Sequence, residues 1–161
     1  MNKGNDENRK KRRLFYRFCL MFMMLIIFSF SNQPGKVSSK VSNAVANTLQ
    51  IEQKSENVAV SSQPLFAGLS LRKYAHIILY FFLGLFAILS VQDNRRKWYI
   101  NFLIAFAICF LYSCSDEFHQ AFVPGRKAAM KDLFLDSIGY SVSIAVSIFA
   151  INICKKRERS F

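Results

Sequence analysis

The stretch SDEFHQAFVPGR, residues 115–126, combines two carboxylates, a histidine, an amide and an arginine with a Pro-Gly pair that favours a turn. Carboxylates beside histidine are typical of general acid-base sites, and a guanidinium group binds two oxygens of a phosphate or carboxylate. Directly before this stretch, residues 101–114 form the apolar run NFLIAFAICFLYSC. Such a group of polar residues is expected where a membrane segment meets water.

Two further polar stripes recur at i, i+4, i+8 spacing where apolar blocks begin: Arg72, His76 and Tyr80 in one, and Asp132, Asp136 and Tyr140 in the other. On a helix, each triplet forms a single stripe that runs into the membrane. Asp136 would lie about one helical turn, roughly 6 Å, deeper than Asp132. Because a carboxylate is costly against lipid, we expect Asp136 to face the protein interior.

The elements that must position these residues are apolar blocks separated by short charged segments, a pattern typical of membrane proteins. The blocks predict an all-α bundle of four transmembrane helices, at residues 18–30, 74–91, 98–114 and 133–154. The first block is shorter than the roughly 20 residues that a span needs, but it extends to 14–30 if Arg17 snorkels to the membrane surface. A cleaved signal peptide is the alternative, and the lack of an Ala-x-Ala site favours an uncleaved anchor.

The blocks divide the chain into a basic head (1–17), the first span, a polar loop (31–71), a core of three spans (72–154) and a basic tail (155–161). Within the polar loop, apolar residues recur at helical spacing, at Val37, Val41, Ala44, Val45 and Leu49. This spacing fits two interpretations, an amphipathic helix at the membrane surface or a disordered connector.

Basic residues are distributed unevenly between the blocks. Of the 22 lysines and arginines, 14 lie in the head, in the 92–97 link and in the tail, and eight lie in the remaining segments. Because short cytoplasmic segments are enriched in basic residues, we predict cytoplasmic termini and an extracytoplasmic position for residues 115–126. The net charge of +12 does not indicate nucleic-acid binding, since the basic residues flank apolar blocks and form no base-reading motif.

Side chains of metal-ligand type are present but lack a ligand spacing such as HExxH: His76, Glu117, His119, Asp132 and Asp136. We therefore predict neither a metal nor a cofactor. The four cysteines lie within apolar blocks or at their ends and have no CxxC spacing, so we expect them to pack as small apolar residues.

The antiparallel layout puts the polar ends of spans two, three and four at the same depth. The expected cluster consists of Arg72, Lys73, His76, Tyr80, Asp116, Glu117, Gln120, Arg126, Asp132 and Asp136. Its arginines and lysine suit the phosphate or carboxylate of a membrane lipid, a lipid-linked molecule or a cell-wall precursor. If the site is catalytic, His76 and Glu117 are the candidate proton-transfer pair. In the opposite interpretation, the acids pair with the arginines and only stabilise the bundle.

Taken in order, LRKYAHIILYFFLG, SDEFHQAFVPGRKAAMKD and DSIGY resemble the VanZ-like family of small bacterial membrane proteins. The matching positions are Arg72, Lys73, His76, Tyr80, Ser115, Asp116, Glu117, Gln120, Pro124, Gly125, Arg126, Asp132, Asp136 and Gly139. The likeness extends over about residues 20–153. It implies a multi-pass protein of the bacterial plasma membrane with a cell-envelope role. The family is named after a protein linked to resistance to the glycopeptide teicoplanin.

Three classes of function follow from these patterns. The favoured class is an envelope protein that binds an anionic lipid-linked or cell-wall ligand. The alternatives are a membrane-embedded hydrolase or transferase that uses Glu117 and His76, and a structural or assembly protein. The sequence leaves open whether the protein is an enzyme and how many copies assemble. Transport is disfavoured, because no inverted repeat is visible.

Overall fold

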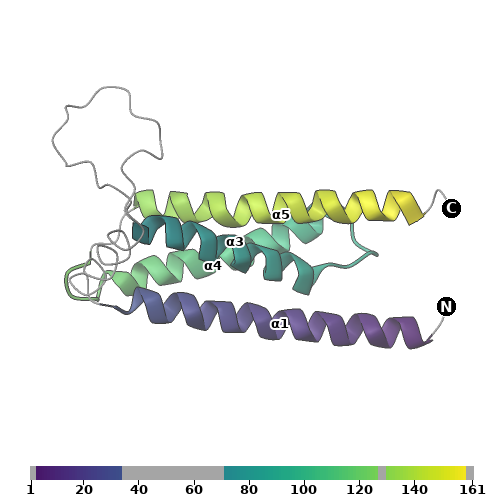
Figure 1. Cartoon of the computed structure of the whole chain (residues 1–161), viewed down its shortest axis with the longest axis horizontal. Coiled ribbons are helices and arrows are strands. Elements are labelled where there is room, and N and C mark those ends of the chain that lie inside the picture. Colours follow the sequence, from purple (N-terminus) through teal and green to yellow (C-terminus); the bar gives the residue numbers. More distant parts are fainter. Residues whose placement is uncertain (1–2, 34–70, 127–129, 159–161) are drawn as a thin grey trace, which may run out of the picture.

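A computed structural model describes residues 3–33, 71–126 and 130–158 of the chain (Figure 1). All the regular secondary structure within these residues is α-helical. The helices are α1 (Lys3–Ser31), α3 (Leu71–Val91), α4 (Trp98–Gln120) and α5 (Met130–Glu158). Each contains an apolar stretch long enough to cross a membrane. This confirms the predicted all-α bundle of four transmembrane helices. The amphipathic helix expected within the polar loop falls on residues 34–70, outside the described part of the chain.

The helices alternate in direction along the bundle (Figure 1). Helix α1 begins and α5 ends at the same end, which also holds the 92–97 link between α3 and α4. We call this the link end. Helices α1 and α4 end, and α3 and α5 begin, at the opposite end, which we call the turn end because it holds the turn at residues 121–126.

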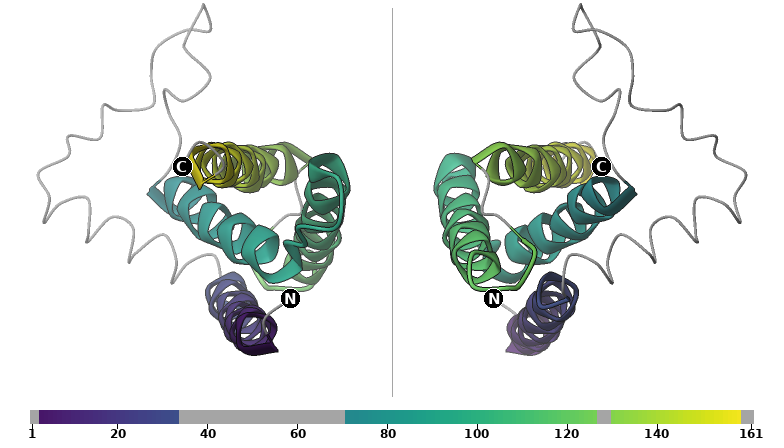
Figure 2. Two further views of the ribbon diagram at one scale, coloured as in Figure 1. Left: turned by 90° about the vertical axis from the view of Figure 1, so that its right-hand side faces the viewer. Right: turned by 90° about the vertical axis from the view of Figure 1, so that its left-hand side faces the viewer.

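Seen along the bundle, α3, α4 and α5 form a triangle (Figure 2). Helix α1 packs on the side formed by α3 and α4, and α5 lies on the other side of that pair. Large apolar side chains of α1, among them Phe18, Met21 and Leu25, are exposed on the surface of the bundle. Exposed apolar side chains of this size are expected where a helix faces lipid rather than water.

Two glycines allow α3 and α5 to approach closely. A methyl group on Gly84 would lie 2.7 Å from the carbonyl oxygen of Tyr140, and one on Gly139 would lie 2.6 Å from that of Ile77. Small residues at such crossings let helix backbones touch, which is how membrane helices gain packing energy. The four cysteines are free thiols, with Cys109 buried and Cys154 exposed.

Helix α4 is longer than its apolar block, because it continues to Gln120. Residues 115–120 therefore lie on its last turns, and only residues 121–126 leave the helix. The Arg126 amide donates a hydrogen bond to the Val123 carbonyl at 3.1 Å, and Gly125 has φ 78°. Pro124 and Gly125 thus occupy the positions that a type II turn requires of them.

Candidate functional site

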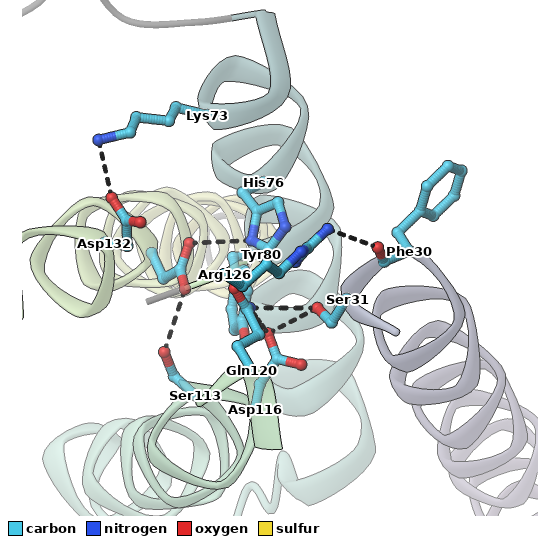
Figure 3. Close-up of polar contacts among 11 residues, drawn as sticks. Phe30, Ser31, Lys73, His76, Tyr80, Ser113, Asp116, Gln120, Arg126 and Asp132 are labelled. Carbon is cyan, nitrogen blue, oxygen red and sulfur yellow. Dashed lines mark hydrogen bonds and ion pairs between the residues drawn. The ribbon is translucent and has the colours of Figure 1, made fainter. Parts of the chain in front are cut away.

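A cluster of polar side chains from several helices lies at the turn end (Figure 3). Its best-bonded member is Asp116 of α4, whose side chain is 3% exposed. Asp116 Oδ2 accepts hydrogen bonds from Ser31 Oγ at 2.9 Å, Tyr80 OH at 3.2 Å and Gln120 Nε2 at 3.0 Å. Because these donors come from α1, α3 and α4, one carboxylate oxygen joins three helices.

A second buried carboxylate, Asp136 of α5, is 1% exposed. Its Oδ2 accepts a hydrogen bond from Ser113 Oγ of α4 at 3.3 Å, and its Oδ1 lies 3.7 Å from Nδ1 of His76 on α3. This position keeps the carboxylate away from lipid, where a charge would be costly. The Asp136 carboxylate therefore lies beside the imidazole ring of His76.

The outer rim of the cluster is an ion pair. Lys73 Nζ of α3 lies 2.9 Å from Asp132 Oδ1 of α5, and both side chains are partly exposed (Figure 3). Behind this pair is a small pocket lined by Lys73, His76, Glu117, Gln120, Asp132, Leu135 and Asp136. Its volume of about 10 Å³ is close to what one water molecule needs.

The turn places its arginine against the end of α1. Arg126 is 9% exposed, and its NH2 group donates a hydrogen bond to the Phe30 carbonyl at 3.0 Å (Figure 3). The last carbonyls of a helix have no partner within the helix and carry a partial negative charge. Arg126 therefore caps α1 and fixes the turn to it.

The structure brings most of the predicted site residues to this end of the bundle: Lys73, His76, Tyr80, Asp116, Glu117, Gln120, Arg126, Asp132 and Asp136. Glu117 is 8% exposed and lines the pocket beside His76. Arg72 belongs to the first turn of α3, but its side chain lies outside the described part of the structure.

His119 lies apart from the pocket, because its ring packs against Phe28 of α1 with a centroid distance of 4.7 Å. Within residues 3–33, 71–126 and 130–158, no three His, Cys, Asp or Glu side chains come close enough to hold a metal ion together.

Sequence reasoning missed two members of the cluster, Ser31 and Ser113. A serine at the end of an apolar block carries no periodic signal, and its role depends on which helix lies opposite. Ser113 had one usable signal, since it precedes Asp116 by three positions and therefore shares its helix face.

The electrostatics of the turn end combine both signs of charge. Four carboxylates face a lysine, a histidine and an arginine, and α3 and α5 both begin here. Helix N-termini carry a partial positive charge and unpaired amides, so they favour an anion nearby. The arrangement can bind an anionic group at Lys73 or move a proton at His76.

A family model described as VanZ/LLP1 matches residues 16–151, a range that contains every member of the cluster. Comparisons with curated proteins and with solved structures gave no match. The family match agrees with the resemblance seen in the sequence motifs, and the four apolar helices agree with a multi-pass membrane protein. The chain therefore belongs to the VanZ/LLP1 family.

Proposed function

We propose that the protein works at the cell envelope, in the bacterial plasma membrane, and that its turn end binds the anionic group of a lipid-linked or cell-wall ligand on the extracytoplasmic side. The orientation is supported by the basic residues, because 14 of the 22 lie in segments that adjoin the link end. Short segments this rich in lysine and arginine are retained in the cytoplasm.

One observation carries the binding proposal: Lys73 lies at the rim of a pocket between three helices, two of which begin there, although Glu117, Asp132 and Asp136 also line this pocket. Lys73 and His76 come from α3 and Gln120 comes from α4, while α5 supplies a helix N-terminus. The Lys73 side chain is 32% exposed, so a ligand can reach it from outside the bundle. A phosphate at this position would also gain from the positive ends of α3 and α5.

In the unliganded protein, the Asp132 carboxylate occupies the position beside Lys73 that the anionic group of the ligand would take. Its carboxylate already binds Lys73 at 2.9 Å, so an incoming phosphate replaces one anion with another at the same ammonium group. Asp132 is partly exposed, and the released carboxylate is solvated where it stands. The ion pair therefore closes the pocket in the unliganded protein and competes with the ligand.

Binding is tested with a polyprenyl pyrophosphate as the probe, added to the detergent-solubilised protein. Lys73→Gln is expected to weaken binding roughly tenfold or more, because it removes one charge-assisted hydrogen bond. Asp132→Asn is expected to strengthen binding, because it frees Lys73 from its competitor. Lys131→Gln is the matched control, since Lys131 is an exposed neighbour of Asp132 that does not line the pocket.

If Lys73→Gln and Lys131→Gln lose the same binding affinity for the polyprenyl pyrophosphate, the ligand is attracted by overall positive charge and not by a specific site. That result would contradict the proposal. If Lys73→Gln and Asp132→Asn lower the yield of folded protein without changing binding, the ion pair is structural. We also propose that the protein alters the susceptibility of cells to teicoplanin, and Lys73→Gln should remove this effect at unchanged protein level.

A specific geometry favours hydrolysis as a second function. A buried carboxylate beside a histidine is a feature of many general bases, and Asp136 Oδ1 lies 3.7 Å from His76 Nδ1. The adjoining pocket has room for one water molecule and is also lined by Glu117. In this reaction His76 takes a proton from water while the water oxygen forms a bond to a phosphorus atom. The bridging P–O bond of the phosphoanhydride breaks and releases inorganic phosphate, and the proton on His76 passes through Glu117 to the departing phosphate oxygen.

The catalytic function predicts a division between binding and turnover. His76→Gln should leave binding of the polyprenyl pyrophosphate within about twofold and should lower phosphate release by a factor of 10² or more. Phosphate release is measured with the purified protein, and Lys131→Gln again serves as the control. Absence of turnover in the wild type would exclude this second function while leaving the binding proposal intact.

A further inference from the structure

The link end contains a cavity at the opposite end of the bundle from the polar cluster. It has a volume of about 310 Å³ and is formed by the α3–α4 link, the start of α4 and the last turns of α5. Its lining includes Arg96, Trp98, Ile148, Ile151, Lys155 and Lys156. The cavity is thus basic on one part of its wall and apolar on another.

Hydrogen bonds within the 92–97 link and to Asn101 fix the backbone of the link, and with it the backbone position of Arg96. The Asn101 side chain is 1% exposed, donates to the Asp93 carbonyl at 3.0 Å and accepts from the Asp93 amide at 3.3 Å. The Arg96 amide donates to the same carbonyl at 3.2 Å. Asp93 itself faces Arg13 of α1 at 3.6 Å, and it does not line the cavity.

The charged side chains that line the cavity, among the described residues, are all positive. Arg96, Lys155 and Lys156 contribute three positive groups, and no carboxylate lies among the described residues that line it. Helix α4 begins here at Trp98, and its N-cap residue Lys97 makes no side-chain hydrogen bond to the first amides. These amides add to the attraction for an anion.

The apolar part of the wall indicates what kind of anion fits. Trp98 lines the cavity and is 60% exposed, and Ile148 and Ile151 lie on the face of α5 that borders it. Tryptophan and tyrosine concentrate where membrane helices cross the level of the lipid headgroups. A ligand at this depth meets basic groups on one side and hydrocarbon on the other.

We propose that this cavity is a binding site for an anionic phospholipid. The phosphate lies among Arg96, Lys155 and Lys156, and an acyl chain runs along Trp98 and Ile151. The site is separate from the polar cluster, and it holds whether or not the turn end binds a ligand.

The experiment compares lipids on the full-length protein in detergent, using native mass spectrometry and thermal unfolding. Phosphatidylglycerol should bind and raise the unfolding temperature more than phosphatidylcholine. The double variant Arg96→Gln/Lys155→Gln should weaken phosphatidylglycerol binding by about 25-fold, because each basic group near an anionic lipid contributes a factor of roughly five. The matched control Lys10→Gln/Arg12→Gln removes the same two charges from exposed positions of α1 and should retain wild-type affinity to within about twofold.

Three results would overturn the proposal. If the double variant and its control lose the same affinity for phosphatidylglycerol, the lipid is attracted by the overall charge of the protein and not by the cavity. Equal stabilisation by inorganic phosphate would show that the acyl chain is not held. Equal binding of phosphatidylcholine would show that the basic groups do not select the lipid. If the double variant fails to fold, Lys155→Gln alone carries the test, with an expected loss of about fivefold.

Discussion

The two ends of the bundle differ in the sequence separation of the residues that their hydrogen bonds join. At the turn end, the hydrogen bonds join residues far apart in sequence, such as Ser31 with Asp116 (85 positions) and Arg126 with Phe30 (96 positions). At the link end, they join near neighbours, such as Asn101 with Asp93 (eight positions). The turn end therefore acquires its geometry only when the bundle assembles, whereas the link can form from its own short segment.

Helix α1 shows the consequence of this difference. Toward the turn end it is tied to the rest of the bundle by Ser31, by the Phe30 carbonyl and by the Met24 carbonyl, which accepts a hydrogen bond from Tyr112 at 2.5 Å. Toward the link end, Arg13 of α1 forms an ion pair with Asp93 of the 92–97 link, and both side chains are partly exposed. Exposed pairs of this kind contribute little to stability. We therefore expect the attachment of α1 to depend mainly on the turn end.

The largest expected effect comes from removing the carboxylate at the centre of the turn end. Asp116→Ala leaves the Ser31, Tyr80 and Gln120 donors without their buried acceptor and should lower the free energy of unfolding by about 3 kcal/mol. Hydrogen exchange measured by mass spectrometry should then show faster exchange at the last turns of α1 and unchanged exchange in the 92–97 link.

Asp116→Asn is the matched control, because its amide oxygen can still accept hydrogen bonds from the same donors. It should retain most of the stability. Faster exchange at the link end in Asp116→Ala, equal to that at the turn end, would refute the view that the two ends are fastened independently.

The last three helices were the most predictable part of this fold, because an apolar block of about 17 residues or more has few alternatives to a membrane span. The first block, at residues 18–30, is shorter and was less certain. Helix ends were harder to place. The apolar block ends at residue 114, yet α4 continues through residues 115–120, where Asp116 and Gln120 both form hydrogen bonds with Ser31 of α1. The local sequence around a polar residue does not show whether its hydrogen-bond partner lies on another helix, so it does not show that the helix continues through that residue.

The candidate site was predictable where spacing carried information. His76 and Asp136 were placed on inward stripes by their i, i+4 relation to other polar residues, and the structure brings them to 3.7 Å. Arg126 was expected to hold an acid or a ligand, but it also caps α1 through the Phe30 carbonyl. Backbone acceptors of that kind become visible only when the position of the helix end is known.

The smallest expected effect lies at the link end and depends on pH. The backbone amide of Arg95 donates a hydrogen bond to Asp93 Oδ1 at 3.0 Å, and together with nearby Arg13 it holds the pKa of this carboxyl below its ordinary value of 3.8. A lowered pKa in the folded state means that the ionised Asp93 stabilises the fold at neutral pH. This contribution is complete above pH 3.8 and is lost as the pH falls through the lower pKa of the folded protein.

Asp93→Asn should therefore destabilise the protein at pH 7 by less than about 1 kcal/mol, because the side chain is partly exposed and solvent screens its charge. The difference from the wild type should shrink toward zero as the pH falls below the lowered pKa of Asp93 in the folded protein, because both side chains are then neutral, and thermal unfolding in detergent measures it at each pH. Arg13→Gln should reproduce only part of the effect, since the Arg95 amide still binds the carboxylate. A loss at pH 7 as large as that of Asp116→Ala would mean that α1 is anchored at the link end after all, and the contrast between the two ends would fail.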